Sequence, residues 1–251
     1  MKLHFHASGS AKSQEALALL TARYGQSILE EADVIVALGG DGLMLDVLHQ
    51  TSHLQTPVYG MNRGTVGFLM NGYAVEDLEK RIFTAFNQAI HPLALTAVDH
   101  TGQTHSARAI NEVSLLRKGP QAANLKISID GHERMETLMG DGVLLATPAG
   151  PTAYNYSAFG PILPIGANVL ALTPIAAFRP RRWRGAVLPA TAKVTFENLD
   201  PEKRPLVVSA DGQSIEDVVR ADVSVDTNHY HNVLFDPEHS LEERILKEQF
   251  V

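Results

Sequence analysis

The sequence Gly-Gly-Asp-Gly at residues 39–42 contains the residue types and spacing that point most directly to chemistry. It follows the apolar run at residues 34–38, which has the length and composition of a buried parallel strand. It precedes residues 43–49, a stretch of helical length whose first turn would offer free N–H groups. Glycines let the backbone turn sharply and leave the Asp41 carboxylate unshielded. The segment predicts a site for phosphate or ribose chemistry; the alternative is a tight strand-to-helix turn capped by a surface aspartate.

A second aspartate between glycines, Asp141, precedes a long uncharged stretch. Residues 142–178 contain no charged residue and no histidine. The loop at residues 147–157 combines glycines and prolines with neutral donors and acceptors, and such a loop can hold a nucleotide through hydroxyls and backbone N–H groups. The alternative is an Asp-Gly turn between two strands. The polar side chains are those of Thr147, Thr152, Tyr154, Asn155 and Ser157.

Asn111 and Glu112 interrupt an apolar stretch, following residues 107–110 and preceding residues 113–116. Consecutive polar residues in a buried strand must find partners. They fit a site for a sugar diol or an adenine edge, and they equally fit a bulge.

Four arginines lie within residues 179–184, beside Trp183, the only tryptophan. Their guanidinium groups could contact phosphate or stack with Trp183 in a patch between subunits. An exposed, solvated loop is the alternative.

Metal and thiol chemistry have little support in the sequence. There is no cysteine, which removes thiol nucleophiles and fits a reducing cytoplasm. The histidine pairs at residues 4 and 6, 49 and 53, and 229 and 231 have no third ligand nearby in the sequence. We therefore predict no metal site built by the protein, and expect any divalent cation to arrive with a nucleotide.

The elements expected in the first third of the chain alternate between strand and helix. We expect strands at residues 3–7, 34–38 and 57–61, and helices at residues 12–24, 43–51 and 74–89. The last helix would place Leu78, Ile82 and Phe86 on one face. This alternation predicts a parallel α/β sheet.

From residue 93 onward, short strand-like runs are separated by turn signals. We expect strands at residues 93–98, 107–116, 124–129, 143–147, 169–172, 193–197, 205–210 and 222–226, and a tail helix at residues 240–250 that returns to the first domain. The predicted fold class is an N-terminal parallel α/β domain followed by an all-β, β-sandwich-like domain. The expected boundaries are residues 1–92 plus 236–251 for the first domain and 93–235 for the second.

Composition limits the partners. The 251 residues carry a net charge of −7, which argues against nucleic acid as the main partner because no basic excess neutralises phosphates. The first seven residues are too short and polar for a signal peptide and indicate a strand. Prolines within residues 142–178 break any membrane-spanning helix. We expect no membrane association and a cytoplasmic location.

Five motifs occur in the order found in NAD kinases, and the chain resembles compact bacterial members of that family from about residue 33 to residue 213. They are the sequences at residues 39–42, 60–69, 111–112, 140–154 and 209–213. The resemblance implies phosphorylation of the adenosine ribose 2′-hydroxyl of NAD by ATP, or by polyphosphate. It also implies a divalent cation (Mg²⁺) bound with ATP, and a homo-oligomer, either dimer or tetramer.

The resemblance also implies residue roles, carried over by matching motif. Asp41 would be the general base that takes the hydroxyl proton, with Gly42 beside the dinucleotide. Asn111 and Glu112 would hold the ribose and nicotinamide side, and Asp141 a polar edge of the ligand. The remaining residues of the implied pocket are the lining pair Phe68 and Leu69, the adenosine-wrapping Thr152, Ala153, Tyr154, Asn155, Tyr156 and Ser157, and lastly Ala176 and Gln213.

Two positions depart from the family pattern. Leu43 stands where the family usually has Thr or Ser, and Pro151 stands where a serine is common. Both departures concern contacts to the phosphate donor. A lipid kinase with the same glycine-aspartate turn is one alternative, and a non-catalytic NAD- or NADP-binding regulator, suggested by Leu43, is another.

Overall fold

The computed structural model describes residues 1–64, 67–150 and 152–237. The chain divides into two compact units, Met1–Ile90 with Asn228–Val251, and His91–Thr227. The helix expected at residues 240–250 lies outside the described residues. Within the described ranges, no helix is long and apolar enough to cross a membrane.

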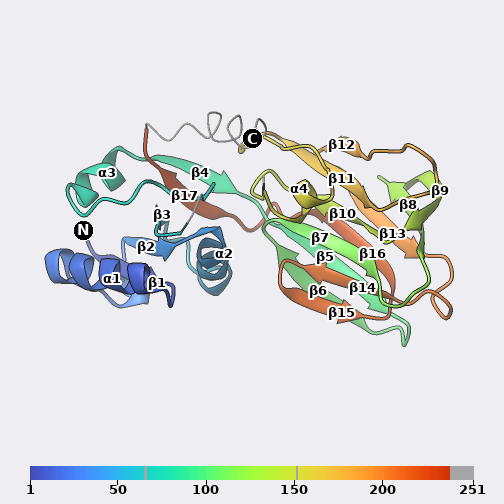
Figure 1. Ribbon diagram of the computed structural model, residues 1–251, viewed down its shortest axis with the longest axis horizontal. Coiled ribbons are helices and arrows are strands. Elements are labelled where there is room, and N and C mark those ends of the chain that lie inside the picture. The colour runs from blue at the N-terminus through green and yellow to red at the C-terminus, as the bar shows by residue number, and fades with distance from the viewer. Residues whose placement is uncertain (65–66, 151, 238–251) are drawn as a thin grey trace. The chain divides into compact units, whose positions relative to one another are not determined.

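The first unit is an α/β domain (Figure 1). Its described residues form a sheet in the order β1-β2-β3-β17-β4, in which β1, β2, β3 and β17 run parallel and β4 runs antiparallel to β17. The strands are β1 (Leu3–Ala7), β2 (Val34–Gly39), β3 (Val58–Asn62), β4 (Phe86–Ile90) and β17 (His231–Phe235). The helices are α1 (Ala11–Tyr24), α2 (Asp41–Gln50), α3 (Leu78–Thr84) and the short 3-10 helix η1 (Leu29–Glu31).

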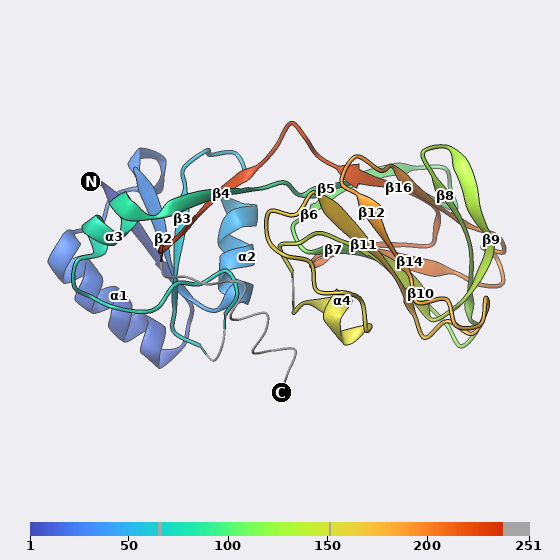
Figure 2. The same cartoon turned by 90° about the horizontal axis from the view of Figure 1, so that it is seen from above.

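Strand β2 is buried along its whole length because helices cover both faces of the sheet. Val34, Val36 and Leu38 pack in one core cluster with residues of α1 and α3. The alternate residues Ile35 and Ala37, also fully buried, point to the opposite face, on which Figure 2 shows α2. A continuous apolar run is therefore what a central parallel strand requires.

The second unit is an all-β sandwich of two antiparallel sheets. The two inner faces share one apolar core with Phe196, Leu145 and Leu125 fully buried in it. One sheet contains β12 (Ala186–Pro189), β11 (Val169–Ile175), β10 (Gly142–Ala146), β7 (Glu112–Arg117), β14 (Leu206–Ala210) and β15 (Gln213–Glu216), in that order. The other contains β6 (Thr104–Ala109), β5 (Leu93–Asp99), β16 (Val218–Val225), β13 (Val194–Asn198), β8 (Ala123–Ile129) and β9 (His132–Gly140). A single turn of helix, α4 (Tyr154–Ser157), follows β10.

The long helix expected at residues 74–89 is wrong. It is the seven-residue α3 followed by strand β4, because Ala85 is extended (φ −62°, ψ 143°). Phe86 lies in β4 and pairs with Phe235 of β17, a strand from the far end of the chain. The pairing partner, which is remote in sequence, overrides the local helical pattern.

The single strand expected at residues 107–116 is also wrong. It is two strands, β6 and β7, which belong to different sheets and are separated at Ile110 and Asn111. Strands β9, β12, β15 and β17 were not expected. β9 is mostly exposed and polar, so it lacks the apolar alternation by which half-buried strands are recognised.

Candidate functional site

Asp41 is the first residue of α2, and Gly40 caps that helix. The helix therefore begins two residues earlier than expected, and the aspartate belongs to its first turn. A Cβ atom at Gly39 would lie 2.6 Å from Cδ2 of Leu43, so glycine is required where the side chain of Leu43 packs over the turn. Leu43 thus has a packing role in this unit.

The Asp41 carboxylate is held by two consecutive backbone N–H groups. Phe68 N donates to Oδ2 at 2.8 Å, and Leu69 N donates to Oδ1 at 2.9 Å. The motifs at residues 39–42 and 60–69 therefore meet, and Phe68 and Leu69 contact Asp41 through their backbone while their side chains are buried. Each carboxylate oxygen has two lone pairs, so Asp41, which is half-buried, retains capacity to accept a further proton or hydrogen bond.

In the second unit, Asn111 and Glu112 lie where the chain enters β7, and Asp211 organises this segment. The Asp211 carboxylate accepts the N–H groups of Ile110 (2.6 Å), Asn111 (3.0 Å) and Glu112 (3.3 Å). Thr147 closes the other side: its hydroxyl donates to Ile110 O at 2.6 Å and its N–H to Asn111 O at 2.8 Å. These contacts hold the backbone of residues 110–112 where the chain passes from β6 to β7.

Sequence reasoning did not single out Asp211. Its signal was the Asp211-Gly212 turn between β14 and β15, where Asp211 adopts φ 48°. An Asx residue in the left-handed region is typical of a turn, and nothing local in the sequence shows that its carboxylate reaches residues 110–112.

Glu112 is an acid of this unit whose pKa is strongly raised. Burial and the negative charge of Asp211 raise the pKa of Glu112 to about 7, against the opposing effect of the N–H groups of Asn155 and Tyr154. Its Oε2 atom is buried and finds no hydrogen-bond partner among the described residues. A buried acceptor without a donor is costly, so Glu112 is suited to accept a hydroxyl or N–H group from a ligand.

The loop after β10 is fixed by a buried polar contact. Asn155, 3% exposed, accepts the hydroxyl of Thr173 at 2.6 Å and donates to Pro161 O at 2.8 Å. Gly160 lies so close that its Cβ would overlap Asn155 Oδ1. The side chain of Asn155 therefore shapes the loop from inside. Of the other residues expected here, Thr152, Ala153 and Tyr154 are half-buried, and Tyr156 and Ser157 are exposed.

Asp141 lies where the chain passes from β9 to β10, and its flanking glycines are required by packing. A Cβ at Gly142 would lie 2.0 Å from Leu115 O, and one at Gly140 would lie 2.7 Å from Ala177 Cα. The carboxylate forms an ion pair with Arg117, which sequence reasoning did not single out. Burial and the charges of Asp141 and Glu112 raise the pKa of Tyr154.

The remaining expected residues lie at the ends of strands. Ala176, exposed with φ 47°, follows β11, and Gln213, exposed, begins β15 opposite Ala210. The arginines of residues 179–184 are exposed, whereas Trp183 packs against the sandwich core. No group of three or more possible metal ligands occurs in residues 1–64, 67–150 and 152–237.

Comparison with known proteins finds relatives that match this chain over nearly its full length. The model of the ATP-NAD kinase N-terminal domain matches residues 5–90, and that of the ATP-NAD kinase C-terminal domain matches residues 110–234. The chain is 60% identical over 250 residues to an NAD kinase of Cereibacter sphaeroides, covering 100% of this chain and 98% of the relative. It is 56% identical over 249 residues to an NAD kinase of Caulobacter vibrioides, covering 99% and 96%.

Two solved structures share the fold. Yeast NADH kinase complexed with NADH superposes with a TM-score of 0.83 at 22% identity, covering 99% of this chain and 86% of that one. An NAD kinase from Archaeoglobus fulgidus in complex with ATP superposes with a TM-score of 0.80 at 22% identity, covering 100% of both chains. With both domain models matched in order and relatives similar over their full length, the chain belongs to the NAD kinase family.

Proposed function

We propose that the protein transfers the γ-phosphoryl group of ATP to the 2′-hydroxyl of the adenosine ribose of NAD, giving NADP and ADP. The observation that carries the chemistry is the Asp41 carboxylate, fixed at the start of α2 by the N–H groups of Phe68 and Leu69. The family membership supplies the substrates, since relatives at 56% and 60% identity are NAD kinases over nearly their full length. Neither a lipid kinase nor a non-catalytic regulator is favoured by these relatives.

Asp41 acts as general base in this proposal. An alcohol has a pKa far above 7, so its attack requires an acceptor for the proton as the new bond forms. The 2′-oxygen bonds to the γ-phosphorus while the bond from that phosphorus to the bridging oxygen of ADP breaks. The hydroxyl proton passes to the Asp41 carboxylate, and ADP leaves with the bonding electron pair.

The second unit supplies recognition groups. We assign Glu112, whose Oε2 atom lacks a donor among the described residues, and Asn111 to ribose hydroxyls on the nicotinamide side. We assign residues 152–157 to the adenosine, together with Gly42, Asp141, Ala176 and Gln213 at the ligand's edges. The side chain of Asn155 serves by holding the loop, because it is buried and bonded internally.

We propose that a divalent cation, Mg²⁺, accompanies ATP. Because the described residues contain no cluster of metal ligands, the cation would be held by the nucleotide phosphates. We also propose a cytoplasmic homo-oligomer, either dimer or tetramer, with ATP or polyphosphate as the donor.

The test is production of NADP. Purified protein is incubated with NAD, ATP and Mg²⁺, and NADP is detected with an NADP-specific dehydrogenase; a parallel reaction contains polyphosphate in place of ATP. We expect NADP with at least one donor. Absence of product with both donors would show that the proposed function is wrong.

Asp41→Asn tests the general base. The variant should lower kcat by about 10²–10⁴-fold while NAD binding, measured by calorimetry, largely survives. Asp46→Asn is the matched control, because Asp46 is an exposed residue of the same helix, and it should retain wild-type kcat. Retained turnover in Asp41→Asn would exclude the role as base.

A further inference from the structure

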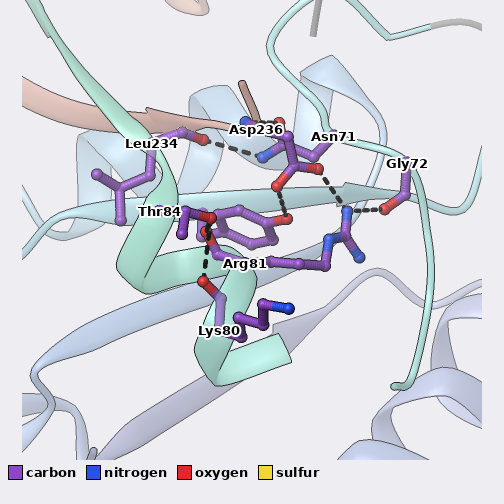
Figure 3. A network of polar contacts seen from close by, with 8 residues as sticks. Asn71, Gly72, Lys80, Arg81, Thr84, Leu234 and Asp236 are labelled. Atoms are coloured by element: carbon purple, nitrogen blue, oxygen red, sulfur yellow. Dashed lines mark hydrogen bonds and ion pairs between the residues drawn. The ribbon is translucent and has the colours of Figure 1, made fainter. Parts of the chain in front are cut away.

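Asn71 is a buried residue that joins two strands of the first unit. Its backbone N–H donates to Gly60 O at 2.8 Å, and its carbonyl accepts Asn62 N at 2.9 Å, which ties it to β3. Its side-chain Nδ2 donates to Leu234 O at 2.9 Å, and Oδ1 accepts Asp236 N at 2.9 Å, which ties it to the end of β17 (Figure 3). Asn71 is 0% exposed, and all four contacts are direct hydrogen bonds.

The chain that precedes Asn71 is anchored at its other end by Arg63. The N–H of Arg63 donates to Gly39 O at 2.7 Å, one residue before the cap of α2. Its Nε donates to Lys12 O at 3.0 Å, and its guanidinium lies 4.0 Å from the ring centroid of Tyr73. Arg63 and Asn71 are therefore each attached to a strand of the sheet, Arg63 to β2 and Asn71 to β3.

Close packing also constrains residues 67–70, which directly precede Asn71. A Cβ at Gly60 would lie 2.6 Å from Sδ of Met70, and one at Gly67 would lie 2.8 Å from its Cγ. Met70 is fully buried, so these residues are closely packed. The N–H groups at residues 68–69, which precede Met70, are thus held at the Asp41 carboxylate.

Asp236, to which Asn71 is bonded, is itself fixed by two neighbours. Tyr59 Oη donates to its Oδ1 at 2.6 Å, and Arg81 Nη2 donates to its Oδ2 at 2.5 Å. Arg81 Nη2 also donates to Gly72 O at 2.7 Å (Figure 3). Burial and Asp236 raise the pKa of Tyr59, so its hydroxyl stays protonated and continues to donate.

We propose that Asn71 is a positioning residue for Asp41, acting through the N–H groups of Phe68 and Leu69 and taking its own position from β17 and Asp236. This inference rests on the proposed role of Asp41 in phosphoryl transfer. When the Asn71 side chain is removed, the two N–H donors lose their fixed place and the Asp41 carboxylate turns away from the geometry that proton transfer needs.

The experiment compares Asn71→Ala with Asn87→Ala. Asn87 offers a matched control because its side chain also bonds to β17, donating to Asn232 Oδ1 at 2.8 Å, but from β4 at the exposed edge of the sheet. Steady-state kinetics are measured with NAD and ATP. The fraction of each protein that is folded and binds NAD is determined by titration with NAD, and kcat is expressed per binding site. Amide hydrogen exchange of Phe68 and Leu69 is followed by NMR.

We expect Asn71→Ala to lower kcat by about 10–100-fold, with each KM changing less than about threefold. Exchange of the Phe68 and Leu69 amides should accelerate at least about tenfold, and Asn87→Ala should leave all of these values unchanged. A purely structural role would lower the NAD-binding fraction without changing kcat per binding site.

Unchanged kcat in folded Asn71→Ala, or equal losses in both variants, would overturn the inference. If Asn71→Ala does not fold, Asn71→Ser replaces it; this variant keeps a neutral polar side chain at the buried position but is too short to reach both Leu234 O and Asp236 N. Wild-type protein in the same assay separates the two proposals. An inactive wild type would contradict the proposed NAD kinase activity. An active wild type with equally active variants would contradict the positioning role of Asn71.

Discussion

Two aspartates, one in each unit, hold loops of polypeptide in the same way. Asp41 accepts the N–H groups of residues 68–69, and Asp211 accepts those of residues 110–112. Hydrogen bonds from N–H groups to a charged carboxylate are strong and short, so each aspartate sets the path of a segment remote in sequence. Asp41 differs because it lies on the first turn of a helix, where positive potential favours a phosphorylated ligand.

At the residue scale, Glu112 gives a prediction for pH. Its folded-state pKa is raised to about 7, so between about pH 4.5 and pH 7 the folded chain binds more protons than the unfolded chain. Stability from this group is therefore lost as the pH rises. Between about pH 4.5 and pH 7 the free energy of unfolding of wild type should fall by on the order of 1–3 kcal/mol relative to that of Glu112→Gln.

Urea unfolding at pH 5, 6, 7 and 8 measures this difference. Glu133→Gln, which alters an exposed glutamate of β9, is the control and should follow the wild-type dependence. Parallel curves for wild type and Glu112→Gln would contradict the assigned perturbation of Glu112.

At the scale of elements, the glycines around Asp141 mark a crossing between sheets. The chain leaves β9 of one sheet at Gly140 and enters β10 of the other at Gly142. A similar transfer from β6 to β7 occurs at residues 110–111. Both transfers deliver polar residues that the family resemblance assigns to the ligand, so the strand ends of the sandwich determine where these residues lie.

Gly142→Ala should strongly destabilise the second unit. Its Cβ would lie 2.0 Å from the Leu115 carbonyl oxygen, a backbone atom that cannot move aside alone, and we expect a loss of about 3 kcal/mol or more. Gly119→Ala, where nothing lies within 4 Å of the new Cβ, should cost little. The melting temperatures of both variants are measured by thermal unfolding followed by circular dichroism. Equal melting temperatures would be inconsistent with this packing.

At the scale of the whole molecule, the first unit is built from two separate parts of the chain, Met1–Ile90 and Asn228–Val251. After the sandwich it returns as β17, which lies between β3 and β4 in the sheet of the first unit. Asn71 bonds to both β3 and β17, so the returning strand completes the surroundings of the loop that holds Asp41. The first unit therefore depends on residues that follow the entire second unit.

A chain ending at Thr227 should lose the fold of the first unit and keep that of the second. It lacks β17 and so separates β3 from β4, whereas residues 91–227 retain both sheets of the sandwich. Limited proteolysis with mass spectrometry should yield a protected fragment close to residues 91–227. The full-length chain, which keeps β17, is the control and should protect both regions; equal protection in the two chains would contradict the prediction.

The alternation of strands and helices from β1 to β3, the all-β character of the second unit and the motifs of the site were predictable, because strand and helix periods and glycine-flanked acids are local patterns. Asp41 and Glu112 could be singled out in this way. Their partners could not, since Phe68 lies 27 residues from Asp41, and Asp211 lies 99 residues from Glu112.

Only the tertiary structure decided how these residues are held. It turned the expected helix at residues 86–89 into strand β4 because β17 supplies ladder hydrogen bonds from the far end of the chain. It also gave Asn71 four hydrogen bonds to backbone atoms of distant residues, two made by its backbone and two by its side chain. Hydrogen bonds between distant segments leave no period in the sequence, so the sequence alone determined the reactive groups, and the packing of remote strands determined their geometry.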